Sequence, residues 1–510
     1  MTEAHRLKSI ASIKDQTTLP VYGWVAENGY SWRELDFEKT GKAGFRKLSK
    51  QKTNIDFLNT IDAKKIQENR NLMNGSGVAI GDYDNDGLVD IYLCHLEGPN
   101  KLFKNLGNWR FVDVARYANV DLKKSLSSGA VFADVNGDNY LDLIVTSLIE
   151  HNSIFYNNGD GTFNNVSKRL NFEESKGSTT VAIADIDGDE DLDIYVTNYK
   201  EKSLKDSYAF TKLSPQDIFY PPSKNEEITS AVDVKNYLRV KDKYKDQLTY
   251  RLNPGGVELL EYGQNDFIYI NKGDFDFDKI EIGSNRFMAE YPSKNMVIKD
   301  WGLTTRFQDI DNDGDPDIYV CNDFWTPDRI WVNNGEGKFS TLDNLEMRKS
   351  SSSTMSVDFS DIDRNGTIDF FVADMLSRDH KKKKTQMGLM SPTAVSIGKI
   401  DNRPQYMRNT LFFNRGDNTY AEIAHLAGLQ GSEWTWSSIF LDIDLDGYED
   451  LITTNGHMYD VQDADTQIKL SSEKLGSLKE YQRQIFQYPV LKTSNLIFKN
   501  NGDLTFKESS

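Results

Sequence analysis

The chain carries the stretch Asp82-Tyr83-Asp84-Asn85-Asp86-Gly87-Leu88-Val89-Asp90, which has carboxylates at its first, third, fifth and ninth positions. The glycine at the sixth position favours a tight turn, because glycine adopts positive φ without steric cost. Alternate carboxylates on such a turn point inward and surround a central space with oxygen atoms. Calcium takes about six to eight oxygen ligands in a flexible geometry. The stretch therefore predicts a calcium site.

Five further copies of this loop follow the first, and each keeps Asp or Asn at the same four positions. The predicted ligands, in chain order, are Asp82, Asp84, Asp86 and Asp90; Asp134, Asn136, Asp138 and Asp142; Asp185, Asp187, Asp189 and Asp193; Asp309, Asp311, Asp313 and Asp317; Asp361, Asp363, Asn365 and Asp369; and Asp442, Asp444, Asp446 and Asp450. The second and third copies have Asn139 and Glu190 at the sixth position. Glutamate tolerates positive φ poorly, so we expect the third loop to be the most distorted.

An EF-hand loop begins in the same way, but it needs a glutamate at its twelfth position and a helix on each side. The twelfth position is Leu93 in the first copy and Val320 in the fourth, and neither side chain binds a metal. The runs that flank each loop are short and rich in β-branched and aromatic residues, which indicates strands. Each loop therefore joins two strands. An acidic turn exposed to solvent without a metal is the remaining alternative.

A second motif, an Asn-x-Gly turn followed by an aromatic residue, comes after every loop, and its copies begin at Asn105, Asn157, Asn271, Asn333, Asn414 and Asn500. Asn and Gly are typical of tight hairpin turns, so each repeat reads as a four-stranded antiparallel unit. The loops begin at residues 82, 134 and 185 and again at 309 and 361. Four strands per repeat at a period of about 52 residues predict the blades of a β-propeller.

Together the two motifs resemble the FG-GAP/VCBS repeat family, which includes the integrin α-subunit propeller. The stretches GSGVAIGDYDNDGLVDIYL (residues 75–93) and GSEWTWSSIFLDIDLDGYEDLITTNGH (residues 431–457) are most similar to its ASPIC/UnbV and cartilage-acidic-protein group. The resemblance covers about residues 45–510 and implies an all-β propeller with up to six bound calcium ions. It also implies a secreted, cell-surface or periplasmic protein, although residues 1–16 lack the apolar core of a signal peptide.

We expect a seven-bladed ring, of which six full repeats are visible. Residues 45–49 resemble the outer-strand pattern of residues 163–167, which suggests an N-terminal strand that belongs to a seventh blade. The alternatives are a six-bladed ring, or a last blade built in part from residues 17–50 with a hairpin at Asn28-Gly29. The predicted organisation is an N-terminal segment, residues 1–44, followed by the propeller, residues 45–510.

Almost all the additional chain enters between the second and third strands of three repeats, at residues 200–264, 375–408 and 456–494. The metal loops and hairpins share one face of the ring, so these insertions belong on the other face. Long connections on a rigid scaffold often carry binding function, and we expect a protein or glycan ligand there.

Local patterns suggest helices within two of the insertions. Ser214-Pro215 and residues 229–248 suggest short helices. Residues 469–486 suggest one amphipathic helix. The four lysines at 381–384 form either an anion site or a face exposed to solvent.

Composition narrows the function further. The net charge of −18 argues against a nucleic-acid partner, and no apolar run is long enough to span a membrane. Cys94 and Cys321 lie at the same strand position of the first and fourth repeats. They are too far apart to be bridged, so we expect buried free thiols. We expect a monomer.

The sequence favours a non-enzymatic, calcium-stabilised binding module, and the alternative is a metal-assisted carbohydrate lyase or dehydratase. An enzyme needs a convergent set of acid and base groups, and only His380 and His457 lie at the roots of insertions. Trp434 and Trp436 either stack on a sugar or pack between blades.

Overall fold

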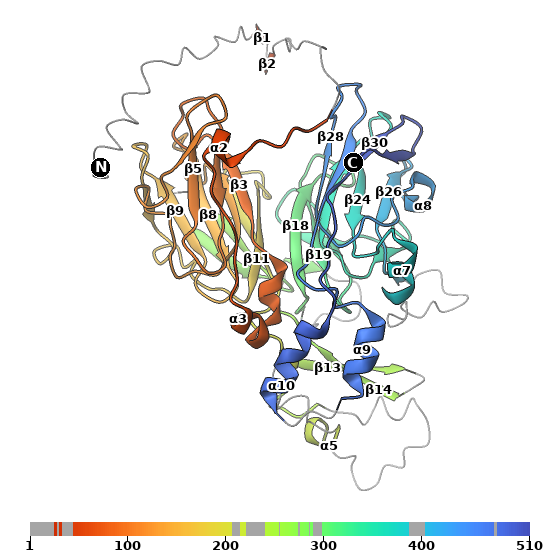
Figure 1. Ribbon diagram of the computed structural model, residues 1–510. Coiled ribbons are helices and arrows are strands. Elements are labelled where there is room, and N and C mark those ends of the chain that lie inside the picture. Colours follow the sequence, from red (N-terminus) through yellow and green to blue (C-terminus); the bar gives the residue numbers. More distant parts are fainter. Residues whose placement is uncertain are drawn as a thin grey trace.

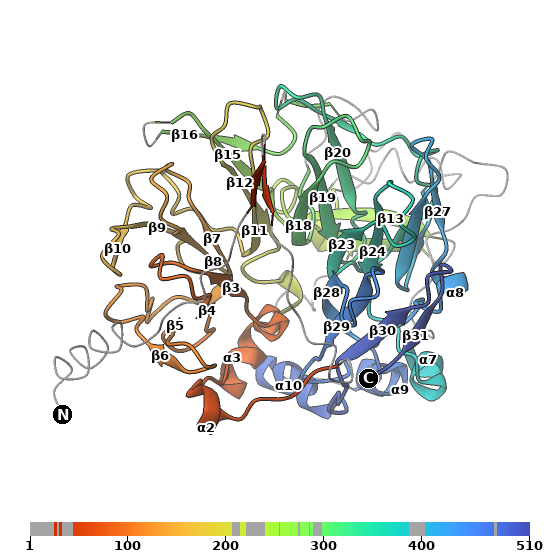
Figure 2. The same cartoon turned by 90° about the horizontal axis from the view of Figure 1, so that it is seen from above.

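The computed structural model describes residues 25–27, 30–32, 44–206, 215–220, 240–253, 256–273, 276–284, 286–288, 298–386, 403–473 and 477–510. Small antiparallel sheets stand around a ring, with their first strands toward the centre (Figures 1 and 2). The fold is an all-β propeller of six blades with few helices. This confirms the predicted fold class and the four-stranded antiparallel blade.

The first three blades each contain four consecutive inner-to-outer strands, apart from one inserted hairpin. Blade one contains β3 (Val78–Gly81), β4 (Asp90–Leu93), β5 (Lys101–Asn105) and β6 (Phe111–Asp113). Blade two contains β7 (Ser127–Ala133), β8 (Asp142–Ser147), β9 (Ser153–Asn157) and β10 (Phe163–Asn165). Blade three contains β11 (Ser178–Ala184), β12 (Asp193–Asn198), β15 (Phe267–Asn271) and β16 (Phe277–Glu281).

The other three blades repeat this order. Blade four contains β18 (Gly302–Gln308), β19 (Asp317–Asn322), β20 (Arg329–Asn333) and β21 (Phe339–Thr341), and β17 (Phe287–Met288) pairs in parallel with β21. Blade five contains β23 (Ser356–Ser360), β24 (Asp369–Ala373), β26 (Thr410–Asn414) and β27 (Tyr420–Glu422). Blade six contains β28 (Thr435–Leu441), β29 (Asp450–Asn455), β30 (Leu496–Asn500) and β31 (Phe506–Glu508).

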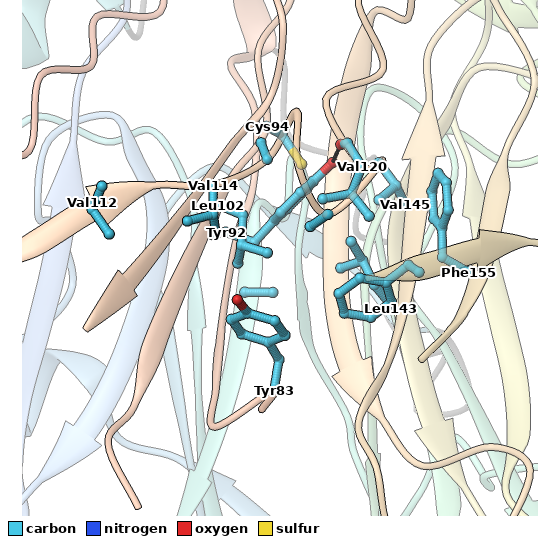
Figure 3. Packing of buried hydrophobic residues seen from close by; sticks show 14 residues of the cluster. Tyr83, Tyr92, Cys94, Leu102, Val112, Val114, Val120, Leu143, Val145 and Phe155 are labelled. Carbon is cyan, nitrogen blue, oxygen red and sulfur yellow. Dashed lines mark hydrogen bonds between the residues drawn. The ribbon is translucent and has the colours of Figure 1, made fainter. Parts of the chain in front are cut away.

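The core of the molecule lies between neighbouring blades, because both faces of each sheet are apolar and each packs on the next sheet. Between blades one and two, Tyr92 and Leu102 pack against Leu143 and Phe155 (Figure 3). The Tyr92 hydroxyl donates a hydrogen bond of 2.7 Å to the carbonyl of Val120. Strands buried on both faces in this way are continuous apolar runs rather than alternating ones.

All three insertions leave their blades between the second and third strands and gather at one end of the ring (Figure 1). The first insertion contains η2 (Leu204–Asp206), α5 (Pro215–Ile218) and the hairpin β13 (Leu248–Asn253) with β14 (Gly256–Glu261). The second contains α7 (His380–Gln386) and β25 (Gln405–Tyr406), which pairs with β22 (Ser350–Ser351). The third contains α9 (Ala464–Ser471), α10 (Leu478–Arg483) and η3 (Gln484–Gln487).

The prediction of one helix over residues 469–486 is wrong, because α9 ends at Ser471 and α10 begins at Leu478. Ser477 caps α10 by accepting a hydrogen bond from the backbone N–H of Glu480. The predicted helix near Pro215 is present as α5. Most of the helix predicted for residues 229–248 lies outside the described residues, and its last residue, Leu248, begins β13.

Among the described residues, four short helices lie outside the insertions: α2 (Lys50–Thr53), α3 (Ala63–Glu68), η1 (Arg70–Asn74) and α8 (Ala424–Ala427).

The expected seventh blade is not formed within the described part of the chain. Residues 45–49 are not a strand, and Phe45 is 65% exposed. The hairpin of β1 (Val25–Glu27) and β2 (Tyr30–Trp32) pairs only with itself. Residues 45–49 resemble an outer strand in sequence, but an outer strand forms only where it can pair with the edge of an inner sheet.

The six blades leave an opening between blade six and blade one. Each inner strand packs on the next around the ring from β3 to β28, but β28 does not pack in this way on β3. Ile80 on β3 is 68% exposed, and Ile439 on β28 is 48% exposed. At the insertion end, α3 contacts α10. In the other blades these strand positions face a neighbouring blade, so apolar side chains line both walls of the opening.

No helix in the described residues is long and apolar enough to cross a membrane. Cys94 and Cys321 are buried free thiols, as predicted. Burial raises the pKa of the Cys94 thiol to about 12.

Candidate metal-binding loops

The six Asp-rich loops share one backbone conformation, which the aspartate at the first position holds. In the fourth loop, the Asp309 carboxylate accepts hydrogen bonds of 3.1 Å from the backbone N–H groups of Asp313 and Gly314. The other five loops have the same pair of bonds. This bonding closes each loop around the remaining carboxylates.

The aspartate at the ninth position links each metal loop to the Asn-Gly hairpin of its own blade. One carboxylate oxygen of Asp317 accepts from the backbone N–H of Ile310, and the other accepts from the backbone N–H of Asn333. The same two bonds occur in all six blades. Loops and hairpins therefore share one end of the ring, as the sequence predicted.

Burial dominates the electrostatics of these ninth-position carboxyl groups. It raises the pKa to about 7, against backbone hydrogen bonds that lower it, in five of them: Asp90, Asp142, Asp193, Asp317 and Asp369. Neighbouring aspartates of the same loops raise the pKa further. A cation among these carboxylates would stabilise the ionised form.

Carboxylate oxygens converge in most of the loops. Groups of three lie with their ligand atoms within 4.8 Å of one another: Asp82, Asp84 and Asp86; Asp185, Asp187 and Asp193; Asp309, Asp311 and Asp317; Asp361, Asp363 and Asp369; and Asp442, Asp444 and Asp450. One oxygen of the third-position aspartate, Oδ1, is buried without a hydrogen-bond partner at Asp187, Asp311, Asp363 and Asp444. A buried carboxylate oxygen without a partner is costly, and a hard divalent cation is the ligand that such oxygens suit. These residues fit calcium.

The second loop departs from this arrangement. It has Asn136 at the third position, and the side-chain amide of Asn136 donates to Asp138 at 3.1 Å. Within the described residues its side chains form no group of three converging acidic ligands. An amide supplies one oxygen and no charge, so we expect the second loop to bind a cation more weakly than the third, fourth and fifth loops.

The expectation that the third loop is the most distorted is wrong. Glu190 adopts φ 73°, close to the φ of 83° at Gly87, and its backbone N–H still bonds to Asp185. The loop keeps its converging group of Asp185, Asp187 and Asp193. Two hydrogen bonds to Asp185 hold the strained residue in place. A strained backbone conformation of this kind costs about 1–3 kcal/mol and persists where the surrounding structure imposes it.

Two lysines that the sequence did not single out reach into metal loops. The Lys104 ammonium forms ion pairs with Asp84 and Asp86 in the first loop, and Lys499 forms ion pairs with Asp444 and Asp446 in the sixth. Each lysine directly precedes the Asn of its hairpin. The equivalent residues of the other blades are Tyr156, Ile270, Val332 and Phe413, so a comparison of this position among the repeats would have found both lysines.

The hairpin asparagines also join neighbouring blades, which the sequence did not reveal. The Asn271 side chain donates a hydrogen bond of 2.9 Å to the carbonyl of Val135, in the metal loop of the preceding blade. Asn157, Asn333 and Asn500 make the same bond to Tyr83, Ile186 and Ile362. Asn105 of blade one donates to Val89 within its own blade, as the other hairpin asparagines also do. Within the described residues Asn105 has no bond to a preceding blade, because blade one borders the opening on that side.

Another repeated residue holds the insertion end of each blade. The side-chain oxygen of Asp328 accepts from the backbone N–H of Asn322 at 2.9 Å, just before the third strand. Its other oxygen accepts from the hydroxyls of Tyr319 and Thr354. Equivalent bonds are made by Asn100, Asn152, Asp266, Asn409 and Asn495. The position is Asn in four blades and Asp in two, so the feature common to all six is the side-chain oxygen that accepts this bond.

The other candidates lie in or near the insertions. His457 stacks on Trp434 at 4.1 Å between ring centroids, and Trp434 is buried. Burial lowers the pKa of His457, and Nδ1 lies 2.6 Å from the carbonyl oxygen of Tyr459. Trp434 and His457 therefore pack together, which favours the packing interpretation of this tryptophan over sugar stacking. His380 is the first residue of α7, which also carries the four lysines.

Sequence comparison agrees with the repeated loops. A model described as FG-GAP-like repeat matches residues 82–145, 134–196 and 309–372. The chain contains FG-GAP-like repeats. Each matched segment runs from the metal loop of one blade to the second strand of the next, in blades one to three and in blades four and five.

Curated relatives of this FG-GAP-like chain are forms of cartilage acidic protein 1. The protein from Xenopus tropicalis is 31% identical over 127 residues, which is 24% of this chain and 20% of the relative. The proteins from Mus musculus and Homo sapiens are each 30% identical over 139 residues, which is 27% of this chain and 21% of the relatives. The chain thus matches about a fifth of the length of these relatives.

Two solved structures resemble the FG-GAP-like ring only distantly. One concerns recognition of non-reducing terminal N-acetylglucosamine by an Agrocybe aegerita lectin, with a TM-score of 0.38 and 14% identity over 84% of this chain and 77% of that one. The other is the V. cholerae biofilm matrix protein Bap1, with a TM-score of 0.28 and 12% identity over 76% of this chain and 75% of that one. Likenesses at these scores carry no argument about function.

Proposed function

We propose that this protein is a calcium-stabilised, non-enzymatic propeller that binds a protein or glycan on its insertion face. We propose further that it acts outside the cell, as a secreted or surface-exposed protein. The observation that carries the calcium proposal is the set of buried third-position oxygens without partners, at Asp187, Asp311, Asp363 and Asp444. Calcium bound there would join the two inner strands of a blade through their connecting loop.

The described parts of the insertions support a binding face because they contact one another and the ring. The Gln386 side chain of α7 donates to Gln462 in the third insertion at 3.0 Å. Asn71 of η1 donates to the carbonyl of Lys200 at 2.9 Å, where the first insertion begins. Ordering a residue costs about 1–2 kcal/mol of backbone entropy, so the described segments that pack in this way suggest a role beyond closing the fold.

The same face exposes apolar side chains that a partner could cover. The exposed large apolar residues of the described insertions are Tyr220, Val257, Met458, Ile468, Leu478 and Val490. Lys381 and Lys384 are exposed on α7, which contacts α9 of the third insertion. A patch of apolar and basic groups suits an acidic protein or an acidic glycan.

Calcium dependence is tested by thermal unfolding with and without EDTA, with metal content measured in parallel. Metal binding to the folded state stabilises it by mass action, so chelation should lower the melting temperature and added calcium should restore it. Asp311→Asn should reduce both the number of bound calcium ions and the effect of EDTA. Equal melting curves with and without EDTA, after metal removal is verified, would refute the calcium proposal.

Ligand binding is tested with glycan and protein arrays in calcium. Lys381→Glu combined with Lys384→Glu should weaken any binding that is found. The matched control is Lys338→Glu with Lys507→Glu, which changes the same charge at exposed positions of the blades. Binding that is lost in the control but kept in the α7 variant would place the ligand site away from the insertion face.

A further inference from the structure

The first metal loop differs from the fourth and fifth in having a lysine ammonium group that is ion-paired with its carboxylates. The Lys104 ammonium is 2.6 Å from the Asp86 carboxylate and also forms an ion pair with Asp84. The Lys104 side chain is 8% exposed. The positively charged end of a lysine is rarely buried to this extent without acidic partners, so Asp84 and Asp86 explain how it is accommodated.

The strand position of Lys104 decides whether a loop receives such a charge. Position 104 is the last residue before the hairpin asparagine, and its side chain lies beside the metal loop of the same blade. The same position holds Ile270, Val332 and Phe413 in blades three, four and five. Ile270 and Val332 pack into the core between blades instead. Their loops therefore receive no ammonium group from this position.

The sixth loop is intermediate. Lys499 pairs with Asp444 and Asp446, but its side chain is 42% exposed because no blade packs beside β30 on the open side of the ring. The exposed Lys499 ammonium can move into solvent when a divalent cation binds. The buried Lys104 ammonium has no such access to solvent, so it stays with Asp84 and Asp86.

We infer that the Lys104 ammonium is the resident cation of the first loop, so that this loop folds without calcium while the fourth and fifth loops require it. This inference rests on the proposed calcium binding for the contrast among loops, but the role of Lys104 in the metal-free protein does not depend on it. The sixth loop, with a displaceable Lys499, binds calcium more weakly than the fourth.

The test compares the wild type with Lys104→Met, which keeps the length of the side chain and removes the charge. Native mass spectrometry in calcium counts the bound ions, and thermal unfolding in EDTA measures the metal-free protein. Lys104→Met should bind one more calcium ion than the wild type, with at least about tenfold tighter binding at the first loop. In EDTA it should melt several degrees lower, since three carboxylates are left without a cation, and calcium should reverse that loss.

Two matched variants separate the charge from the side chain. Lys101→Met removes a lysine of the same strand that pairs with Asp113 at a partly exposed site, and it should leave both readouts unchanged. Lys104→Arg retains the charge and should keep the melting temperature in EDTA near that of the wild type. If Lys104→Met does not fold even with calcium, Lys104→Arg and Lys499→Met still test the role of the charge.

The outcomes that overturn the inference are distinct from failure of the calcium proposal. The inference is wrong if Lys104→Met melts in EDTA like Lys101→Met, or if the wild type already holds calcium in the first loop as tightly as in the fourth. If no variant binds calcium in any loop, the proposed function fails. The melting of Lys104→Met in EDTA then still decides whether Lys104 is the cation of its loop.

Discussion

At the scale of single residues, the same structural position uses different chemistry in different blades. The residue before the third strand is Asn100 in blade one and Asp328 in blade four, and both accept a backbone hydrogen bond through an oxygen. Asn100 donates its amide to the Tyr92 hydroxyl, whereas Asp328 accepts from the Tyr319 hydroxyl. The tyrosine hydroxyl can reverse its role, so an amide and a carboxyl group both fit.

This exchange predicts a pH-dependent effect of Asp328→Asn. Burial raises the pKa of Asp328 to about 7, against hydrogen bonds that lower it. The folded state then holds a proton that the unfolded state loses near pH 4, so this residue's contribution to stability falls as pH rises from about 4 to about 7. Asp328→Asn removes that dependence, and its stability relative to the wild type should rise by about 2–4 kcal/mol between pH 4.5 and pH 7.5.

Urea unfolding at the two pH values, with calcium present throughout, measures this change. Asp56→Asn is the control, because Asp56 is an exposed partner of Lys50 and its loss removes one negative charge without removing a buried group. A stability difference between Asp328→Asn and the wild type that is the same at both pH values would contradict the prediction.

At the scale of elements, the Asn-Gly hairpins do more than reverse the chain. Each hairpin binds the metal loop of its own blade through the ninth-position aspartate, and most also bind the loop of the preceding blade through the asparagine amide. In blade five the bond passes through Tyr420, whose hydroxyl donates to the carbonyl of Ile310. These hairpins therefore connect the metal loop of their own blade to the metal loop of the preceding blade.

Asn271→Ala and Asn105→Ala form a matched pair for this contact between blades. Both remove a hairpin asparagine that accepts a bond from the glycine two residues later. Only Asn271 also bonds to the preceding blade, at the carbonyl of Val135. Asn271→Ala should therefore cost about 1 kcal/mol more in the free energy of unfolding than Asn105→Ala. Equal losses in chemical denaturation would show that the bond between blades contributes nothing measurable.

At the scale of the whole molecule, the ring is held by its blade-to-blade cores and interrupted at one place. Ile80 on β3 and Ile183 on β11 lie two residues before their metal loops and occupy the same position in their blades. Ile183 packs against the core between blades two and three. Ile80 points toward the opening and is 68% exposed.

The opening can be tested by truncating these two isoleucines to alanine. Ile183→Ala should cost about 1–2 kcal/mol of stability, since it removes packed methylene and methyl groups. Ile80→Ala should change stability by less than about 0.5 kcal/mol, as at other exposed positions. A loss for Ile80→Ala as large as that for Ile183→Ala would mean that the walls of the opening are covered in solution, which a change in oligomeric state by light scattering would help to explain.

Periodic features of the fold could be predicted from the sequence alone. The metal loops, the hairpins and the β-branched runs between them are local patterns, and local patterns fix strand–turn–strand units. Their regular spacing predicted four-stranded blades, and the unequal gaps predicted where the insertions leave them. The buried thiols of Cys94 and Cys321 followed from the same register.

Features that depend on contacts between distant residues were decided only by the tertiary structure. Residues 45–49 look like an outer strand, but no inner sheet is present beside them, so the seventh blade is absent from the described chain. Glu190 takes the conformation of a glycine because Asp185 binds the backbone around it. Lys104 enters the first loop because its strand brings it beside residues about twenty positions earlier in the chain. Sequence periodicity specifies each repeat, whereas the neighbours of each repeat determine ring closure, strain and charge.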